Sequence, residues 1–533
     1  MKAWEYTPPQ TLVSIYRKIP SPGRAAFFSA FFGGLLVHLY RLCNMAMVVE
    51  TPYYFYSENN RTDHGRWLLH HVTNLTSWLD MPYLNGVTTI LYLATAAALL
   101  AVLFSVENKL TAGLMGLILA ASPATAVLIH FSYLGDGFAA GFLLAVLAVF
   151  CIQRELQAIK WKGAISVAVG SVLLCCALAI YQSGLDVAAF LCVCLLLQGL
   201  LEQKGFYLRQ FRRFLLMGAF GSGLYFALTQ LILSISGTGL TEHAGLNTMG
   251  SFDLAASLRK LLWLYFDREH PYMNLLVYPT SLIWQLIGWL GLAAFGLTMV
   301  LLLVQKQLYR APVQTVWYIA LLTAMPAAIW LLSILQPQAG GKNALQGFSS
   351  ALLWLALLAF SERLYLQPAR RRTKMYGVPR FLQWGAWGCC LLLAIHFAIF
   401  DNQVYVAARV SYEKDMAACN RLLSRLEQVE GYTPETTICI QGKTIRYAEE
   451  GNYDTYGQKL ERYFPALQPR SALYGQASYL NFLNTFLGTA FKAASAEEEA
   501  GILASDEYAR MQVWPAVNAV QMIDGVLVVR LWE

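Results

Sequence analysis

The segment AAFFSAFFGGLLVHLYRLCNMAMV, residues 25–48, decides the fold class of this chain. It is a largely apolar run, and a helix of about 20 such residues crosses the hydrocarbon core of a membrane, which is roughly 30 Å thick. Comparable runs recur as far as residue 400. The sequence therefore predicts about eleven transmembrane helices, at 25–48, 86–105, 110–131, 136–152, 163–181, 184–201, 214–236, 278–304, 314–335, 347–361 and 382–400.

The composition supports this prediction. Of the 533 residues, 57% are apolar and 13% are charged. That charged fraction is about half the value usual for soluble domains, which excludes a soluble globular protein. The first apolar run follows a polar stretch and is not followed by a cleavage pattern of the A-x-A type. We therefore expect the first helix to be a permanent span and not a signal peptide.

Lys and Arg indicate the orientation, because short cytoplasmic loops carry an excess of these residues. With the N-terminus in the cytoplasm, the basic stretches 153–162, 202–213 and 362–381 all lie inside, whereas the outer loops hold few basic residues. The net charge of +7 is thus spread over several loops, which excludes a nucleic-acid-binding patch. The prediction is a multi-pass, all-α polytopic protein of the cell membrane with a cytoplasmic N-terminus.

An odd number of spans places the end of the chain outside. We predict a transmembrane domain, residues 1–400, and a small extracytoplasmic α/β domain, residues 401–533. In the second domain Asp524-Gly525 separates two apolar stretches and predicts a two-residue β-hairpin turn. The other predicted elements of this domain are a strand over 436–442 and helices over 404–430, 455–463 and 475–492.

Cysteine and histidine spacing gives no sign of a metal site. Most of the ten Cys residues lie in or beside apolar spans, where they are typical packing residues. Only Cys419 and Cys439 lie in the predicted extracytoplasmic domain, where they could form a disulfide. No C-x-x-C pair and no His-x-x-x-His spacing occurs. We expect no metal ion and no other cofactor.

The first outer loop, residues 50–85, differs from the short basic loops elsewhere. It gathers acids, an arginine, a histidine and many aromatic residues in one short segment. This mixture can hold a sugar and a phosphate and transfer a proton, so we interpret the loop as the reaction centre of a membrane enzyme. Its candidate residues are Glu50, Asp63, His64, Arg66, Trp67 and Asp80.

Glu50 ends the first span on the outer side. It could be a solvated helix end, but a helix C-terminus disfavours negative charge. A carboxylate at this place could instead act as a general base on an acceptor hydroxyl. Arg41, two helical turns earlier, faces the bilayer in this interpretation, and it is costly there unless it pairs with an acid, a polar wall or a lipid head group. Snorkelling towards the surface is the alternative.

Arg66 and three residues outside the first loop are expected to edge the same outer cleft. Arg66, in the His64-Gly65-Arg66-Trp67 sequence, is either a plain surface charge or a bidentate grip on a phosphate. Asp136 begins the fourth span and is either a helix cap or a second acid of the site. Tyr181 and Gln182 form the tight outer turn between the fifth and sixth spans.

The second outer loop, residues 237–277, contributes basic residues. Its 251–266 stretch shows helical spacing and predicts a helix lying in the membrane interface. Arg259, Lys260 and Arg268 are either a solvated basic face or the site that holds a lipid-linked phosphate. No G-x-x-x-x-G-K-[ST] loop and no G-x-G-x-x-G following a strand is present, so a nucleotide-phosphate site is not indicated.

In this order the residues resemble a known family. HLYRLCN, an acid after the first span, DHGRWLL and LDMPYLNGVTTILYL are similar to the GtrII family of membrane glucosyltransferases, a branch of the GT-C class. The later stretches SYLGDGFAAGFLLAVLAVF, AIYQSGLDVAAF and VWPAVNAVQMIDGVLVVRLW agree. The resemblance covers nearly the whole chain, and its specificity comes from the order of these stretches.

The resemblance implies a GT-C-like, inverting enzyme of a bacterial cell envelope. Such an enzyme takes a glucosyl or related hexosyl group from a polyprenyl-phosphate sugar, as a substrate and not a cofactor, and places it on an envelope glycan at the outer face. In this pattern the catalytic carboxylate follows span one, which matches Glu50, although many relatives have Asp there. Asp63 and Asp136 are the other catalytic candidates. The implied partners are membrane lipid, the lipid-linked donor and the glycan acceptor.

Two other functions compete with this interpretation. A transporter or flippase of a lipid-linked saccharide also needs many spans, but it commonly buries ionisable groups near the midplane and has repeated halves. The sequence shows neither feature. A sensor with an extracytoplasmic ligand-binding domain would leave the acidic first loop without a role.

Overall fold

A computed structural model gives the fold of the chain. The residues it describes are 7–47, 51, 61–76, 79–154, 160–202, 207–241, 253–266, 276–278, 281–335, 347–366, 377–443, 445, 471–473 and 475–532. The chain divides into two compact units. The first consists of Met1–Leu39, Asn60–Thr76 and Tyr83–Asp401, and the second of Tyr40–Asn59, Ser77–Pro82 and Asn402–Glu533.

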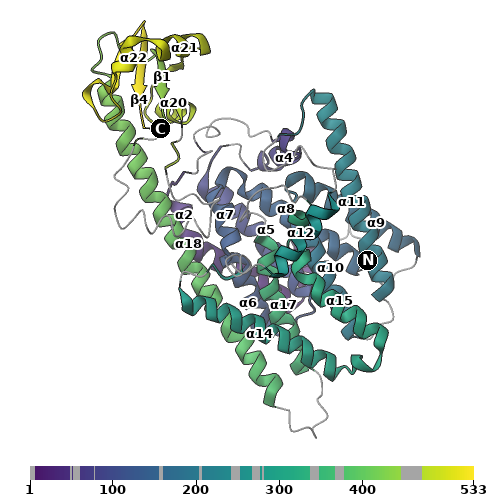
Figure 1. Ribbon diagram of the computed structural model, residues 1–533. Helices are drawn as coiled ribbons and strands as arrows, with labels where there is room; N and C mark the ends of the chain where they lie inside the picture. The colour runs from purple at the N-terminus through teal and green to yellow at the C-terminus, as the bar shows by residue number, and fades with distance from the viewer. Residues whose placement is uncertain are drawn as a thin grey trace. The chain divides into compact units, whose positions relative to one another are not determined.

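Among its described residues, the first unit has helices and connecting turns and no strand. Its helices pack side by side (Figure 1), with α8 against α9 and α10, α9 against α11, α10 against α15, and α17 against α6 and α14. The bounds are α1 Pro8–Lys18, α2 Ser21–Cys43, η2 Thr62–His64, α4 Leu69–Thr73, α5 Pro82–Leu103, α6 Lys109–Ala121, α7 Pro123–His130, α8 Ser132–Arg154, α9 Lys160–Ile180, α10 Gly184–Leu201, α11 Tyr207–Ser236, α12 Leu254–Phe266, α14 Leu282–Gln305, η4 Leu308–Arg310, α15 Pro312–Ile329, α16 Leu331–Leu335, α17 Phe348–Leu366 and α18 Gly377–Leu426.

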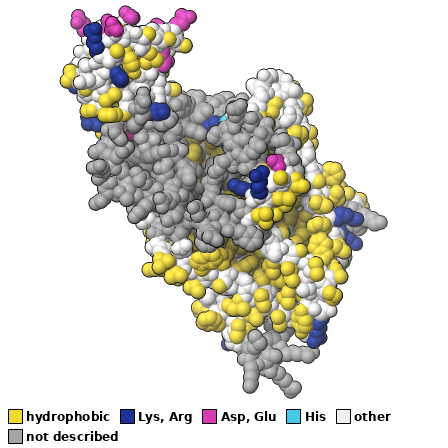
Figure 2. Space-filling view, in the orientation of Figure 1, with side chains coloured by type: hydrophobic (Ala, Val, Ile, Leu, Met, Phe, Trp, Pro, Cys, Tyr) yellow, Lys and Arg dark blue, Asp and Glu magenta, His cyan; other side chains and the backbone are white. Residues whose placement is uncertain are grey.

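Among the described residues, nine helices are long and apolar enough to cross a membrane, or ten if α6 and α7 together form one span. The predicted polytopic, all-α class is therefore confirmed, but the predicted count of eleven is not. Helix α17, which corresponds to the predicted span 347–361, is not among the nine. Figure 2 shows apolar side chains spread over the described surface of the first unit, with few charges between them, as expected of helices that face lipid.

The predicted span 110–131 is bent in the structure. Helices α6 and α7 meet at Ser122-Pro123 at an angle of 46°. Pro123 has no N–H to continue the hydrogen bonding of α6, and the Ser122 side chain caps the new helix by accepting the N–H of Ala124 at 3.3 Å. The bend is thus encoded by one Ser-Pro pair.

The second unit has a small α/β fold around a four-stranded sheet of order β2-β1-β4-β3. The inner pair β1–β4 is parallel, β1–β2 is parallel, and β3–β4 is antiparallel. Asp524 and Gly525 both have positive φ, 48° and 79°, so the predicted hairpin turn between β3 and β4 is confirmed. The bounds are β1 Thr437–Gln441, α20 Gln476–Phe486, β2 Lys492–Ala493, α21 Ala496–Ala504, α22 Asp506–Arg510, η7 Val517–Ala519, β3 Val520–Ile523 and β4 Val526–Arg530.

Residues on alternate positions of β1 enter two separate cores. Ile438 and Ile440 pack with Cys419 and the end of α18, whereas Cys439 packs on the other face of the sheet with α21 and α22 residues. Cys419 and Cys439 are both free. The disulfide considered from the sequence is therefore absent, because the two thiols lie on opposite faces of the sheet.

Helix α18 joins two predicted elements. The expected span 382–400 and the expected helix 404–430 form one helix of 50 residues, Gly377–Leu426. At 1.5 Å per residue its length is roughly 75 Å, more than twice the thickness of a hydrocarbon core. The predicted helix 475–492 is confirmed as the shorter α20, and the predicted helix 455–463 lies outside the described residues.

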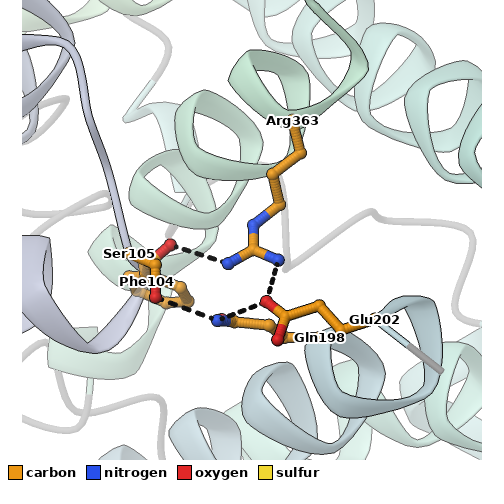
Figure 3. A network of polar contacts seen from close by, with 5 residues as sticks. All are labelled: Phe104, Ser105, Gln198, Glu202 and Arg363. Atoms are coloured by element: carbon orange, nitrogen blue, oxygen red, sulfur yellow. Dashed lines mark hydrogen bonds and ion pairs between the residues drawn. The ribbon is translucent and has the colours of Figure 1, made fainter. Parts of the chain in front are cut away.

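A polar network joins the ends of α5, α10 and α17 (Figure 3). Arg363 donates to the Glu202 carboxylate at 2.9 Å and to the Phe104 carbonyl at 3.1 Å. Gln198 donates to the hydroxyl of Ser105 and to Glu202, both at 3.3 Å. The guanidinium therefore satisfies polar groups that would otherwise be left in a mostly apolar surrounding.

Arg363→Ala removes both of these charge-assisted donors. We expect the free energy of unfolding to fall by roughly 1–3 kcal/mol, because the Glu202 carboxylate and a backbone carbonyl lose their partner. Thermal unfolding of the purified protein in nanodiscs measures the change. The control is Arg310→Ala, which alters an exposed arginine and should shift stability by no more than about 0.5 kcal/mol. Equal effects of the two variants would contradict a role for the network in stability.

Candidate functional site

The turn that carries Arg66 is a local consequence of Gly65. The 3-10 helix η2, Thr62–His64, ends at Gly65, whose φ of 70° is in the left-handed region that favours glycine. The Gly65 N–H donates to the Thr62 carbonyl at 2.9 Å, and the Arg66 N–H donates to the Arg61 carbonyl at 3.1 Å. The chain thus reverses within a few residues and presents Arg66 from a fixed backbone.

Arg66 lies on an aromatic platform. Its guanidinium carbon is 4.7 Å from the centre of the Tyr181 ring and 6.0 Å from that of Phe138. The two rings are themselves in contact, with centroids 4.7 Å apart. The Arg66 Nε donates to the Gln182 side-chain oxygen over a long 3.4 Å. Sequence analysis predicted Arg66, Tyr181 and Gln182 for one cleft, and the structure brings these three together.

Gln182 connects the first outer loop to helix α11 through hydrogen bonds. Its amide nitrogen donates to the His64 carbonyl at 2.9 Å and to the Tyr225 hydroxyl at 3.0 Å. The Tyr225 hydroxyl in turn donates to the Gly65 carbonyl at 3.2 Å. Trp67 donates from its indole nitrogen to the Thr229 hydroxyl at 3.1 Å. The turn 64–67 is therefore held by the α9–α10 connection and by α11.

Three residues of this cluster were not predicted from the sequence. Phe138 is in α8, and Tyr225 and Thr229 are one helical turn apart in α11. Two polar residues at i and i+4 in an apolar span are a signal that could have identified α11. Phe138 carries no such signal, because one aromatic residue in a span is normally a packing residue.

A small cavity beside the platform is lined by Phe138, Gly141, Phe142, Tyr181, Ser183, Gly184, Val187 and Phe348.

Asp63 and His64 form a hydrogen-bonded pair next to this turn. The His64 Nδ1 donates to the Asp63 carboxylate at 2.8 Å, and the Asp63 side chain is 48% exposed. Burial holds the pKa of His64 below its ordinary value, although the hydrogen bond to Asp63 opposes this shift. The pair therefore places an accessible carboxylate and a half-buried imidazole beside Arg66.

Asp136 lies on α8, two residues before Phe138. The helix begins at Ser132, so Asp136 is inside its second turn and does not cap it, which removes that alternative. Its carboxylate is buried, at 1% exposure, and accepts the Gly137 N–H at 2.8 Å. Tyr92 of α5 is in electrostatic range of it. Its carboxylate also hydrogen-bonds with the Thr76 side chain, at the end of the loop segment 61–76 that carries Arg66, but no described contact joins it to Arg66 itself.

Arg41 and Asp80 meet in the second unit. Arg41 is 1% exposed and donates to the carbonyls of Asn44 at 3.1 Å and Ala46 at 3.2 Å. The side chains of Asp80 and Tyr405 interact electrostatically with the Arg41 guanidinium. The expectation that Arg41 faces the bilayer is therefore wrong. Two carbonyls just after α2 accept hydrogen bonds from the guanidinium, and the Asp80 carboxylate lies in electrostatic range of it.

The second outer loop is described only in part. The expected helix is confirmed as α12, Leu254–Phe266, which packs against α15 and α16. Arg259 is exposed, and its Nε approaches the Ala255 carbonyl of its own helix at 3.4 Å. Lys260 lies on the same helix. Glu50, the predicted general base, and Arg268 lie outside the described residues.

Within the described part of the chain, no group of three or more His, Cys, Asp or Glu residues could hold a metal ion.

Residues 39–360 match the protein family described as Glucosyl transferase GtrII. This range holds every residue predicted for the site, from Arg41 to Arg268, and ends before the second unit's sheet. The chain matches none of the curated proteins and none of the solved structures with which it was compared.

The lowered pKa of His64 predicts how stability depends on pH. The unfolded chain, in which the pKa is about 6.5, binds the proton more readily than the folded protein. The free energy of unfolding should therefore fall as the pH decreases through about 6.5 and rise as the pH increases. Melting temperatures of the protein and of His64→Gln between about pH 8 and about pH 5 measure this, and the curve of the variant should be flatter. Identical curves would show that His64 does not contribute.

Proposed function

The chain belongs to the GtrII glucosyltransferase family, and from this membership we propose a specific reaction. The protein is a multi-pass membrane glycosyltransferase. In our proposal it takes a glucosyl or related hexosyl group from a polyprenyl-phosphate sugar and transfers it to a cell-envelope glycan at the outer face of the membrane. A lipid-linked donor agrees with the sequence, which has no nucleotide-phosphate loop.

The observation that carries the proposal is the position of Arg66 on the Tyr181 ring, with Gln182 at its Nε. The Nη donors of a guanidinium held in this way are suited to a phosphate, which they can bind through two parallel hydrogen bonds. Arg66 would bind the donor phosphate and balance the charge that develops on it as the sugar leaves.

The proposed mechanism is a single displacement with inversion. Glu50 takes the proton from an acceptor hydroxyl while that oxygen attacks the anomeric carbon, and the bond from this carbon to the phosphate oxygen breaks. The lipid phosphate leaves with the electron pair, close to Arg66. The alternative candidates for the general base are Asp63, which is accessible beside His64, and the buried Asp136 and Asp80.

A direct assay tests the reaction. The purified protein is incubated in nanodiscs with polyprenyl-phosphate glucose and a panel of envelope glycans, and the products are analysed by mass spectrometry. The proposal predicts a glycan heavier by one hexose and release of the polyprenyl phosphate. A protein that moves the intact donor across a vesicle membrane without forming this product would be a transporter, and the proposal would be wrong.

Arg66→Ala should weaken binding of the polyprenyl-phosphate donor by about 1.5–3 kcal/mol, the range for a charge-assisted hydrogen bond. This corresponds to a roughly 10- to 100-fold higher Kd for the donor. Titration of the donor into nanodiscs that contain the protein measures the affinity. Arg66→Lys should recover only part of it, because an ammonium cannot make the paired hydrogen bonds of a guanidinium.

Arg24→Ala is the matched control for this prediction. Arg24 also lies over a tyrosine ring, that of Tyr16, at the same 4.7 Å. It is not part of the Arg66 cluster, so its loss should leave the donor Kd unchanged. If Arg66→Ala binds the donor normally while Arg259→Ala, Lys260→Ala or Arg268→Ala does not, the second outer loop holds the phosphate and Arg66 does not.

Glu50→Gln keeps the size of the side chain and removes its basicity. We expect turnover to drop by roughly 10²-fold or more, the usual contribution of a general base, while the donor Kd stays close to that of the unchanged protein. Single-turnover rates with saturating donor measure the effect. Near-normal turnover would assign the base to Asp63, Asp136 or Asp80.

A further inference from the structure

Asp186 is a buried acid that the proposed mechanism does not use. It lies in the first turn of α10, four residues after Gln182, and is 1% exposed. Its Oδ1 accepts the backbone N–H of Leu332 at 2.7 Å. Its Oδ2 has no hydrogen-bond partner among the described residues. A buried carboxylate is costly in an apolar surrounding, so its retention at this position requires a physical reason.

The hydrogen bond from Leu332 lies at the break between helices α15 and α16. Helix α15 contains Pro326 and ends at Ile329, and the short helix α16 begins two residues later at Leu331. The Leu332 N–H is at the start of α16, where a helix has no internal acceptor for its first amides. Asp186 supplies that acceptor from α10. The carboxylate thus connects α10 to the start of α16.

The same turn of chain carries the Arg66 platform. The Ser183 carbonyl accepts the Asp186 N–H at 3.1 Å, which connects Asp186 directly to the Tyr181-Gln182-Ser183 connection. The Tyr181 ring lies within electrostatic range of both the Arg66 cation and the Asp186 carboxylate. Residues 181–186 therefore contact both Arg66, through Tyr181 and Gln182, and the start of α16, through Asp186.

Helix α16 in turn contacts α12, the helix with Arg259 and Lys260. We propose that Asp186 is a positioning residue that holds α16 and α12 in fixed register with Arg66, so that the basic residues of the two outer loops act on the same lipid-linked phosphate. This inference rests on the proposed function, and it makes Arg66 and the α12 residues parts of one site and not alternatives.

Glu362 offers a matched comparison. It is a second buried carboxylate that joins segments through backbone amides, and its Oε1 accepts the N–H groups of Glu107 at 2.7 Å and Asn108 at 3.0 Å. It connects α17 to the turn between α5 and α6 and has no described contact with the Arg66 platform. Loss of either carboxylate leaves backbone amides without an acceptor, so the two should destabilise the protein to a similar extent.

The test compares Asp186→Ala, Asp186→Asn and Glu362→Ala in nanodiscs, with the Kd for polyprenyl-phosphate glucose and the melting temperature as readouts. We expect Asp186→Ala to raise the donor Kd about tenfold or more. Asp186→Asn should stay within about threefold, because the Asn side-chain oxygen can still accept the Leu332 N–H. Glu362→Ala should lower the melting temperature but leave the Kd of the folded protein within about twofold.

Two results would overturn the inference. An Asp186→Ala protein whose donor Kd changes no more than that of Glu362→Ala would show that Asp186 has a structural role only. An Asp186→Asn protein as impaired as Asp186→Ala would show that the charge matters and the hydrogen bond to Leu332 does not. If Arg66→Ala itself binds the donor normally, the proposed phosphate site fails; if Arg66→Ala is impaired and Asp186→Ala is not, only the positioning role fails.

Discussion

The hydrogen bonds of the Gln182 side chain are the interaction on which the site depends. One amide group accepts from Arg66 and donates to the His64 carbonyl and the Tyr225 hydroxyl, so it links the first outer loop to two helices. A loop at a membrane surface is ordinarily mobile, and a mobile arginine would lose much of its binding energy to conformational entropy. Because Gln182 holds the His64 carbonyl before Gly65 and the Arg66 side chain after it, the guanidinium is presented in a defined orientation.

The fold was predictable where one local signal decides the structure. Apolar runs identified most of the spans, and Asp524-Gly525 identified the hairpin because both residues adopt positive φ. The length of α18 was not predictable in the same way. The polar residues Asp401 and Asn402 end the apolar run and suggest two elements, but a helix continues through buried polar residues when its backbone hydrogen bonds are kept.

Residue types and the order of the loops predicted which residues belong to the site. They did not predict which side chains interact with one another. Tyr181 and Gln182 were expected at the outer cleft because they are the polar residues of the tight turn between the fifth and sixth predicted spans. The electrostatic interaction of Arg41 with Asp80 joins residues that are 39 positions apart in the sequence, and no local pattern encodes it. The family match extends over the segments that carry these residues, and it supports a glycosyltransferase over a transporter. Donor identity and stereochemistry depend on contacts that spacing alone does not determine.

The central claim is that the first outer loop and the α9–α10 turn form one phosphate site on an aromatic platform. A cryo-EM structure of the protein in nanodiscs with a non-transferable polyprenyl-phosphonate glucose analogue tests it most directly. We expect the phosphonate within hydrogen-bond distance of the Arg66 guanidinium, with that guanidinium still over the Tyr181 ring. A phosphonate bound elsewhere, with Arg66 still bonded to Gln182 and free of ligand, would contradict the account.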